Sequence, residues 1–324
     1  MYGMPRHHTV PEVYLKGFFD PAKVAVRQNV LWLYEENRKI RPRGADAVAA
    51  VEGFNLDPEN DPGKEDLAEK AYAKLEEAAR PVLEKLRAGD PRLTAEEKGA
   101  FSYFIGFQKF RTTWYRETVN AAGVDEFRHT CQRILDEGRV YEYVGTSEAE
   151  RSGRVKFSLH DAEKFIRDMA EGTTDLTQTS KGFALVGALE GGQMLTPKIA
   201  GVHWTLCEAP VSEPWITTDN PVALFEPFPG RRKPGVYGPS LQFLFPISPR
   251  FLLFGEPMTP GPDDRGRVRV PAHTVRMFTD DLLKIAHRQV YASVFSKELQ
   301  SRVNRVFKER GAVIVPMPAN YGRS

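Results

Sequence analysis

The sequence is short of cysteine and of long apolar runs. Its two cysteines, Cys131 and Cys207, are too few for a disulfide framework or a cysteine-rich zinc site, and they are typical of a reducing cytosol. No stretch approaches the roughly 20 apolar residues needed to cross a bilayer. Residues 1–8 have no apolar run after their basic residue, unlike a secretory signal. We therefore expect a soluble, cytoplasmic protein.

Strong charge of one sign and the familiar site motifs are also missing. The 45 Lys and Arg residues against 43 Asp and Glu give a net charge of +2, whereas a dedicated duplex-DNA-binding domain is strongly basic. The sequence has no Walker A loop, no GxGxxG, HExxH or GxSxG pattern and no CxxC pair. Its composition excludes collagen, coiled coil and intrinsic disorder. Function therefore has to be inferred from individual residues.

The order of helical and strand-like texture predicts an α+β fold. Helical spacing dominates 64–137, short aromatic and β-branched runs separated by Pro and Gly dominate 200–260, and helical spacing returns after 271. Helices, then strands, then helices favour α+β over alternating βαβ units. We expect one large domain over 1–324, with an alternative boundary near 140–175. A short antiparallel or mixed sheet over 200–255 is packed by the flanking helices in this prediction.

Individual elements follow from caps and periodicity. An apolar stripe through Leu67, Ala71, Leu75 and Ala78 predicts a helix over 64–86. The capping box that begins at Thr94 opens a helix expected to run to about 121. Further expectations are helices over 125–137, 158–171, 271–292 and 296–310, an exposed loop over 225–239 and a last strand over 312–315.

The helix expected over 101–114 breaks its own pattern. Phe101, Phe104 and Ile105 share one face, and the polar Gln108, Arg111 and Thr112 continue that face. An uncompensated buried guanidinium is costly, so Arg111 has to meet an anion or several carbonyls. Two interpretations remain open. Arg111 either pairs with an acidic residue to tie elements together, or lines a pocket with Gln108 and Thr112 that holds an anionic ligand.

The amino terminus carries a second candidate, His8. Pro11 suits a first helical turn, and the apolar residues after it offer a face that docks the terminus on the body of the protein. Docking holds His7 or His8 against that body. Either histidine is a surface or hydrogen-bonding residue, or one is catalytic.

The third candidate is the strand end at Asp219 and Asn220, where Pro221 stops the pairing. Polar residues at strand ends often form sites, although an Asx-turn explains the same pattern. Asp219 is a natural partner for Arg111. On the first long helix, neither Glu76 nor Glu77 is clearly inward, and Glu77 is kept as a weak candidate for a metal ligand or general base.

Basic clusters occur at 38–43, 231–233 and 265–269. They are either solubilising loop charge or contacts for nucleic-acid phosphates.

Four spaced motifs resemble a known family. They are His8-x-x-Pro11-x-x-Tyr14-Leu15-x-x-Phe18, then Phe107-Gln108-x-x-Arg111-Thr112, then Thr218-Asp219-Asn220-Pro221, then Phe245-Pro246-Ile-Ser-Pro249. In this order they resemble the bacterial family called domain of unknown function 4238. The resemblance implies a soluble prokaryotic protein and no established reaction. It favours His8 over His7, since His8 stands three residues before Pro11.

Two functions fit these residues. The first is a hydrolase acting on a phosphate-containing substrate, such as a nucleotide or a nucleic-acid phosphodiester. His8 is its acid or base, Arg111 with Gln108 holds the anion, Asp219 orients His8 or carries Mg²⁺ or Mn²⁺, and Thr112 and Asn220 position the substrate. The second is a non-catalytic protein that binds an anionic ligand or partner, with 231–233 as a docking surface.

Overall fold

The computed structural model describes residues 5–57, 63–138, 159–172, 181–228, 231–234, 241–257 and 266–309. Helices and several small sheets confirm the α+β prediction. The chain divides into two compact units, of which unit 1 is Met1–Arg116 with Leu185–Val313 and unit 2 is Glu117–Ala184 with Ile314–Ser324. The single domain over 1–324, with its alternative boundary near 140–175, stays a prediction. Within the described ranges, no helix is long and apolar enough to cross a membrane.

Unit 1 is built on a six-stranded mixed sheet with the strand order β11-β5-β10-β9-β7-β8. β11 runs parallel to β5, and all other neighbours are antiparallel. The sheet covers the region where a short sheet was expected and adds β11. The expected exposed loop over 225–239 was wrong in part, because β7 and β8 form a hairpin there. The strands are β5 (His203–Glu208), β7 (Ala223–Phe228), β8 (Arg231–Pro234), β9 (Gln242–Pro246), β10 (Phe251–Glu256) and β11 (Gly266–Arg269).

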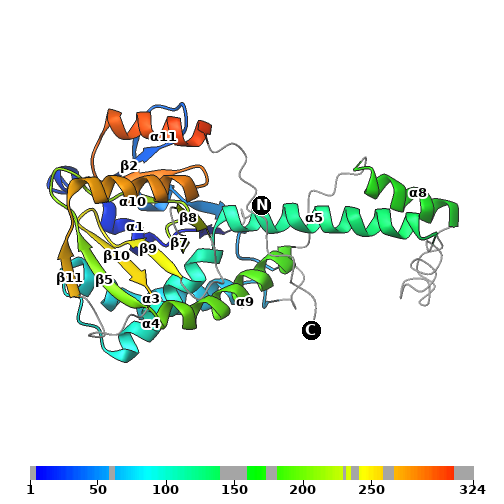
Figure 1. Ribbon diagram of the computed structural model, residues 1–324, viewed down its shortest axis with the longest axis horizontal. Helices are drawn as coiled ribbons and strands as arrows, with labels where there is room; N and C mark the ends of the chain where they lie inside the picture. Colours follow the sequence, from blue (N-terminus) through cyan, green and yellow to red (C-terminus); the bar gives the residue numbers. More distant parts are fainter. Residues whose placement is uncertain are drawn as a thin grey trace. The chain divides into compact units, whose positions relative to one another are not determined.

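Helices cover both faces of this sheet. Alternate strand residues point to opposite sides, and apolar residues such as Leu244 and Phe245 are buried on each side. On one face, the Phe245 ring lies 6.1 Å from Phe101 and 6.2 Å from Phe104 of α4, between ring centroids. On the other face, Leu244 packs with Phe278 of α10. Figure 1 shows α3 and α4 on one side of the sheet and α10 on the other. The helices are α3 (Leu67–Arg87), α4 (Ala95–Phe110), α9 (Lys181–Ala200) and α10 (Ala272–Ile285).

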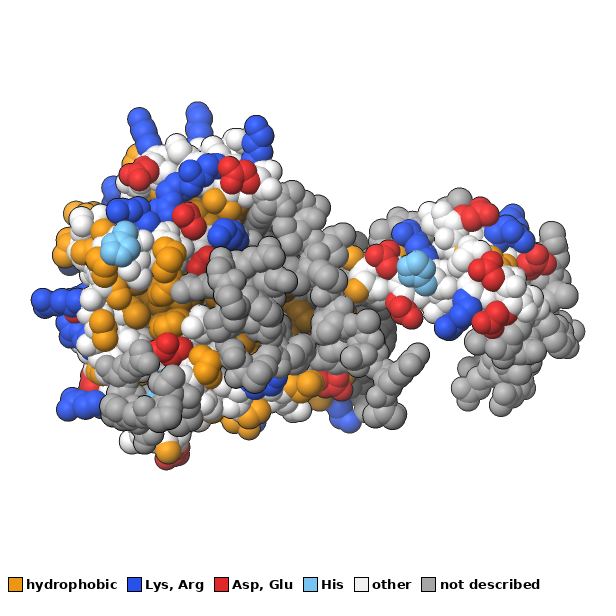
Figure 2. Space-filling model, in the orientation of Figure 1, with side chains coloured by type: hydrophobic (Ala, Val, Ile, Leu, Met, Phe, Trp, Pro, Cys, Tyr) orange, Lys and Arg blue, Asp and Glu red, His pale blue; other side chains and the backbone are white. Residues whose placement is uncertain are grey.

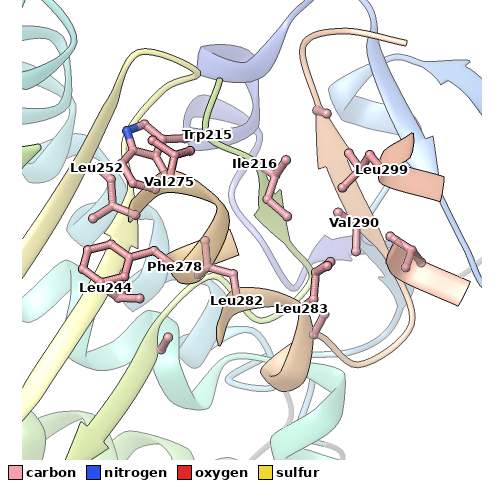
Figure 3. Packing of buried hydrophobic residues seen from close by; sticks show 14 of the residues in the cluster. Trp215, Ile216, Leu244, Leu252, Val275, Phe278, Leu282, Leu283, Val290 and Leu299 are labelled. Atoms are coloured by element: carbon pink, nitrogen blue, oxygen red, sulfur yellow. The ribbon is translucent and has the colours of Figure 1, made fainter. Parts of the chain in front are cut away.

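A second, four-stranded sheet shares the core around α10. Its order is β3-β2-β12-β6, and all its neighbours are antiparallel. Trp215 and Ile216 lead into β6. Trp215 lies beside Val275 of α10, and Ile216 lies toward Val290 of β12 and Leu299 of α11, all in one core cluster (Figure 3). The elements are β2 (Leu31–Tyr34), β3 (Arg41–Arg43), β6 (Thr217–Thr218), β12 (Val290–Ala292) and α11 (Lys297–Glu309). The helix expected over 271–292 therefore ends at Ile285, and its last three residues form β12 instead.

The amino-terminal segment docks on unit 1 as expected. Tyr14, Leu15 and Phe18 are completely buried, and the Tyr14 hydroxyl lies 2.6 Å from Thr217 Oγ1. The segment contains β1 (Arg6–His8), which pairs antiparallel with β4 (Ala50–Glu52). It continues through α1 (Glu12–Leu15), the 3₁₀ turn η1 (Lys16–Phe18) and α2 (Pro21–Val24), with a second 3₁₀ turn, η2 (Ala45–Ala47), before β4.

The helix expected from 95 to about 121 is two helices. α4 opens on the predicted capping box, in which Glu97 N donates to Thr94 Oγ1 at 3.1 Å and Thr94 N donates to the Glu97 side chain at 2.8 Å. It ends at Arg111, and α5 (Thr113–Asp136) begins two residues later. The Thr112 hydroxyl accepts Tyr115 N at 3.2 Å. This is the hydrogen bond of an N-cap residue, which explains the break.

In unit 2, α5 and α8 (Leu159–Ala170) pack through four buried side chains. These are Cys131, Ile134, Ile166 and Met169. α8 corresponds to the helix expected over 158–171, although residue 158 lies outside the described residues. The strand expected over 312–315 lies outside them too.

Gly255 of β10 should tolerate no side chain. An added Cβ would lie 1.9 Å from the ring of Phe243, which is completely buried and cannot move aside. We expect Gly255→Ala to lower the free energy of unfolding by about 1–3 kcal/mol, as overpacked cores do. Denaturant unfolding measures this change.

Gly99→Ala is the control, because a Cβ there meets no atom within 4 Å. Gly99 lies inside α4, where alanine should add about 0.5–1 kcal/mol. If Gly255→Ala is as stable as the wild type or more stable, the packing argument at Gly255 is wrong.

Candidate functional site

The end of β1 is fixed by hydrogen bonds to two other segments. Thr9 donates through its backbone N and its hydroxyl to Ala49 O, at 2.7 and 3.1 Å. Gln108 Nε2 of α4 donates to Thr9 O at 2.9 Å. Ala49 has a φ of 49°, an unusual backbone conformation for alanine. The backbone beside His8 is therefore fixed by hydrogen bonds of Thr9 to Ala49 and to Gln108.

His8 is half-buried, and its Nδ1 is inaccessible with no hydrogen-bond partner among the described residues. Burial lowers the pKa of His8 from its usual 6.5, and Arg111 lowers it further, while the carboxylates of Glu12 and Glu76 oppose the change. The imidazole is therefore neutral at pH 7. A neutral imidazole nitrogen without a partner can accept a proton.

His7 plays a different part from its neighbour. It is buried, and its Nδ1 accepts Asn55 N at 2.9 Å. The buried amide of Asn55 needs that acceptor, so His7 holds the fold together. The two adjacent histidines therefore offer a matched pair, one with its Nδ1 occupied and one without.

Arg111 is buried, with 3% of its side chain exposed, and is paired with two carboxylates. Nη1 donates to the Glu76 carboxylate, and Nη2 lies 3.6 Å from Glu69 Oε2. The guanidinium lies 4.4 Å from the centroid of the Tyr72 ring. Among the described residues its Nε has no hydrogen-bond partner. The expected pair of Arg111 with Asp219 is not formed, because the charge of Arg111 is met by α3.

The buried face of α3 differs from the expected stripe, which explains why Glu76 was missed. The expected Leu67 is 49% exposed, and the buried residues begin at Ala68 and Tyr72. This phase brings Glu69 and Glu76 to the edge of the buried face, three residues before and four after Tyr72. Glu77, the weak candidate, is exposed. A glutamate at each end of a Tyr-centred helical face was the signal available in the sequence.

Asp219 is committed to the backbone of a distant turn. Its carboxylate accepts His287 N and Arg288 N at 2.7 Å and Gln289 N at 3.0 Å. Burial raises the pKa of Asp219, and these amide hydrogen bonds oppose the rise. The side chain therefore shapes the 287–289 turn between α10 and β12.

Asn220 is bonded to a lysine that the sequence analysis passed over. Lys109 Nζ lies 3.4 Å from Asn220 Oδ1 and 3.0 Å from Val222 O, and 5.2 Å from the centroid of the Trp114 ring. Burial lowers the pKa of Lys109 to about 8. Within the described chain this ammonium group contacts no carboxylate. Its position inside an aromatic helix, between Gln108 and Phe110, was the available signal.

The last turn of α4 thus serves two polar groups of residues. One group joins His8 and Arg111 to Glu76, with Gln108 holding the backbone beside His8. The other joins Asn220 to Lys109. Gln108, Thr112, Asp219 and Asn220 all have intramolecular hydrogen bonds, so their roles toward a substrate stay predictions. No three His, Cys, Asp or Glu side chains of the described residues are grouped to hold a metal ion, and the use of Mg²⁺ or Mn²⁺ stays a prediction.

Comparison with known proteins identifies the family. A model described as "Protein of unknown function (DUF4238)" matches residues 6–294, which is most of the chain. The protein therefore belongs to this family, as its four motifs indicate. No curated protein and no solved structure matches the chain.

Replacing Asp219 by alanine should weaken the fold. Three backbone amides lose a charged acceptor, and each such bond contributes about 1.5–3 kcal/mol. We expect the free energy of unfolding to fall by at least about 3 kcal/mol, measured by denaturant unfolding. Asp66→Ala, which removes an exposed i,i+4 ion pair with Lys70, should change it by less than about 0.5 kcal/mol. Equal effects would contradict the structural role of Asp219.

The pKa of Lys109 predicts a pH-dependent stability. Between pH 8 and 10.5 the folded amine is deprotonated while the unfolded amine keeps its proton, so stability rises with pH across this window. The difference between the two values corresponds to roughly 3 kcal/mol. The stability of wild type minus that of Lys109→Met should rise by this amount, measured by chemical denaturation at several pH values.

Lys70→Met is the control, because Lys70 is exposed with 62% of its side chain in solvent. Its difference from wild type should stay flat over the same window. A flat difference for Lys109→Met as well would show that the buried amine keeps its ordinary pKa.

Proposed function

We propose that this protein is a hydrolase of a phosphate-containing substrate, a nucleotide or a nucleic-acid phosphodiester, with His8 as its acid–base residue. The observation that carries the proposal is the neutral, half-buried imidazole of His8 beside the Glu76–Arg111 pair, with an Nδ1 that has no hydrogen-bond partner among the described residues. Catalytic bases need a pKa near or below the working pH and a place where water is limited. His8 meets both conditions.

The chemistry follows from these groups. The half-buried imidazole of His8 takes a proton from water as the water oxygen forms a bond to phosphorus. The bond from phosphorus to the leaving oxygen breaks, and the protonated imidazole returns the proton to that oxygen. Arg111 holds Glu76, whose carboxylate stabilises the imidazolium that forms, and its role as the anion binder stays a prediction.

The remaining predicted residues act as positioning residues in this proposal. Gln108 holds the carbonyl of Thr9, and with it the end of β1. Thr112 caps α5 directly after Arg111. Asp219 and Asn220 hold the turn after α10 and the ammonium group of Lys109.

Lys109 favours a second candidate function, a non-catalytic protein that binds an anionic ligand or partner. Among the described residues its buried ammonium contacts neutral oxygens and a Trp ring, so an anion nearby would offset its charge. A thermal-shift screen of nucleotides, with and without divalent ions, detects either function. A ligand at 100 times its dissociation constant adds about 2.7 kcal/mol. Stabilisation with turnover supports the hydrolase, and stabilisation without turnover supports the binding protein.

The histidine pair provides the sharpest test. With bis(p-nitrophenyl) phosphate and the nucleotides that stabilise the protein, His8→Ala should lower turnover by about 100-fold or more and leave the melting temperature nearly unchanged. In the wild type, kcat/KM should fall on acidification with a midpoint below 6.5, because the base must be unprotonated and burial lowers the pKa of His8.

His7→Ala is the matched control. It leaves the buried Asn55 amide without its acceptor, which should cost about 1–3 kcal/mol of stability, while turnover per folded molecule stays within a few-fold. The reverse pattern, with activity lost at His7 and only stability lost at His8, would overturn the proposal.

A further inference from the structure

Three arginines converge on one carboxylate at the edge of the six-stranded sheet. Glu208, the last residue of β5, accepts Arg250 Nε and Nη2 on Oε1, at 3.0 and 2.6 Å. Its Oε2 accepts Arg267 Nε at 2.8 Å and Arg269 Nε at 3.4 Å. The parallel register of β11 places Arg269 opposite Glu208 and Arg267 opposite Leu206. Parts of the chain far apart in sequence therefore meet at this carboxylate, and we call the four residues the arginine cluster.

The arginine cluster carries excess positive charge. One carboxylate neutralises one of three guanidinium groups, and no other carboxylate of the described residues contacts them. The arginines hold the pKa of Glu208 at about 2, so it stays ionised. A single bidentate arginine would satisfy Glu208. The three like charges exceed what one carboxylate neutralises, which favours an anion from outside.

The cluster is both rigid and accessible. The Phe251 ring lies under two of the guanidinium groups, with centroid distances of 5.3 Å to Arg250 and 5.2 Å to Arg267. Arg269 has 85% of its side chain exposed and Arg250 has 62%. Figure 2 shows Lys and Arg side chains projecting from the edge where Figure 1 draws β11. Arg265, the first residue of this basic stretch of sequence, lies outside the described residues.

We propose that the arginine cluster binds phosphate groups of a nucleic-acid strand. Arg267 and Arg269 stand on the same face of an edge strand, two residues apart, so they form a row that matches a chain of charges. Guanidinium groups pair with phosphate oxygens bidentately. A ligand with a single carboxylate, in contrast, would need only one arginine. Phosphate contacts of this kind do not depend on the base sequence of the nucleic acid. The inference does not rest on the proposed hydrolysis.

The test is binding of a fluorescent single-stranded oligonucleotide at several salt concentrations, by anisotropy. The His8→Ala protein is used throughout so that turnover does not affect the result. Arg269→Ala should weaken binding several-fold and reduce the slope of log K against log salt by about 0.7, the contribution of one phosphate contact on a single strand. The further change Arg250→Ala should repeat both effects. Arg269 has one long contact with Glu208, so an unchanged melting temperature is expected.

Arg38→Ala is the matched control, since Arg38 is 66% exposed and pairs with Glu35 beside the other sheet. It should leave affinity and salt slope nearly unchanged. Equal binding by the parent and the Arg269 and Arg250 variants would overturn the inference. Competition by poly-glutamate as effective as that by the oligonucleotide, per charge, would overturn it in favour of an acidic protein partner. Equally effective competition by inorganic phosphate, per phosphate, would overturn the strand in favour of free phosphate.

Discussion

The position of the amino-terminal segment depends on one partly buried guanidinium group. Arg87 Nη2, near the end of α3, donates to Val13 O at 3.1 Å and Tyr14 O at 2.8 Å, and Nε lies 3.4 Å from Ile247 O after β9. Burial lowers the pKa of Arg87, so the charge is tolerated only because carbonyls surround it. A Cβ on Gly17 would lie 2.5 Å from Nη2, so a side chain there would displace the guanidinium from these carbonyls. One side chain thus joins a helix, a sheet and the segment that carries His8.

The polar residues of the candidate site differ in whether their hydrogen-bonding groups are already used within the protein. Gln108 and Asp219 spend their hydrogen-bonding groups on the backbone, and Thr112 caps a helix. Such residues fix positions. Among the described residues of the site, His8 has a nitrogen without a partner and a pKa moved by burial and by nearby charges of both signs. A preorganised site needs supporting residues whose hydrogen-bonding groups are already paired, placed around a residue with an unpaired group.

Local chemistry explains which parts of this structure could be read from the sequence. The α+β class, the capping box at Thr94 and the docked amino terminus depend on neighbouring residues and apolar spacing, and all three are present. The partner of Arg111 could not be read, because it depends on the rotation of α3, which differs from the stripe through Leu67. The partners of Asp219 are backbone amides about 70 residues away, and backbone amides carry no sequence signal.

The two buried cations of the site, Arg111 and Lys109, differ in how their charge is compensated. Arg111 is neutralised by Glu76 and Glu69, so its burial is compensated within the fold. Lys109 has no such partner in the described chain, although a methionine would fill the same volume without the desolvation cost that lowers its pKa to about 8. Sequences break the rules of core packing mainly where function requires it. The ammonium of Lys109, uncompensated within the described chain, and the unpartnered nitrogen of His8 are two such exceptions, and the proposed binding and hydrolase functions depend on them.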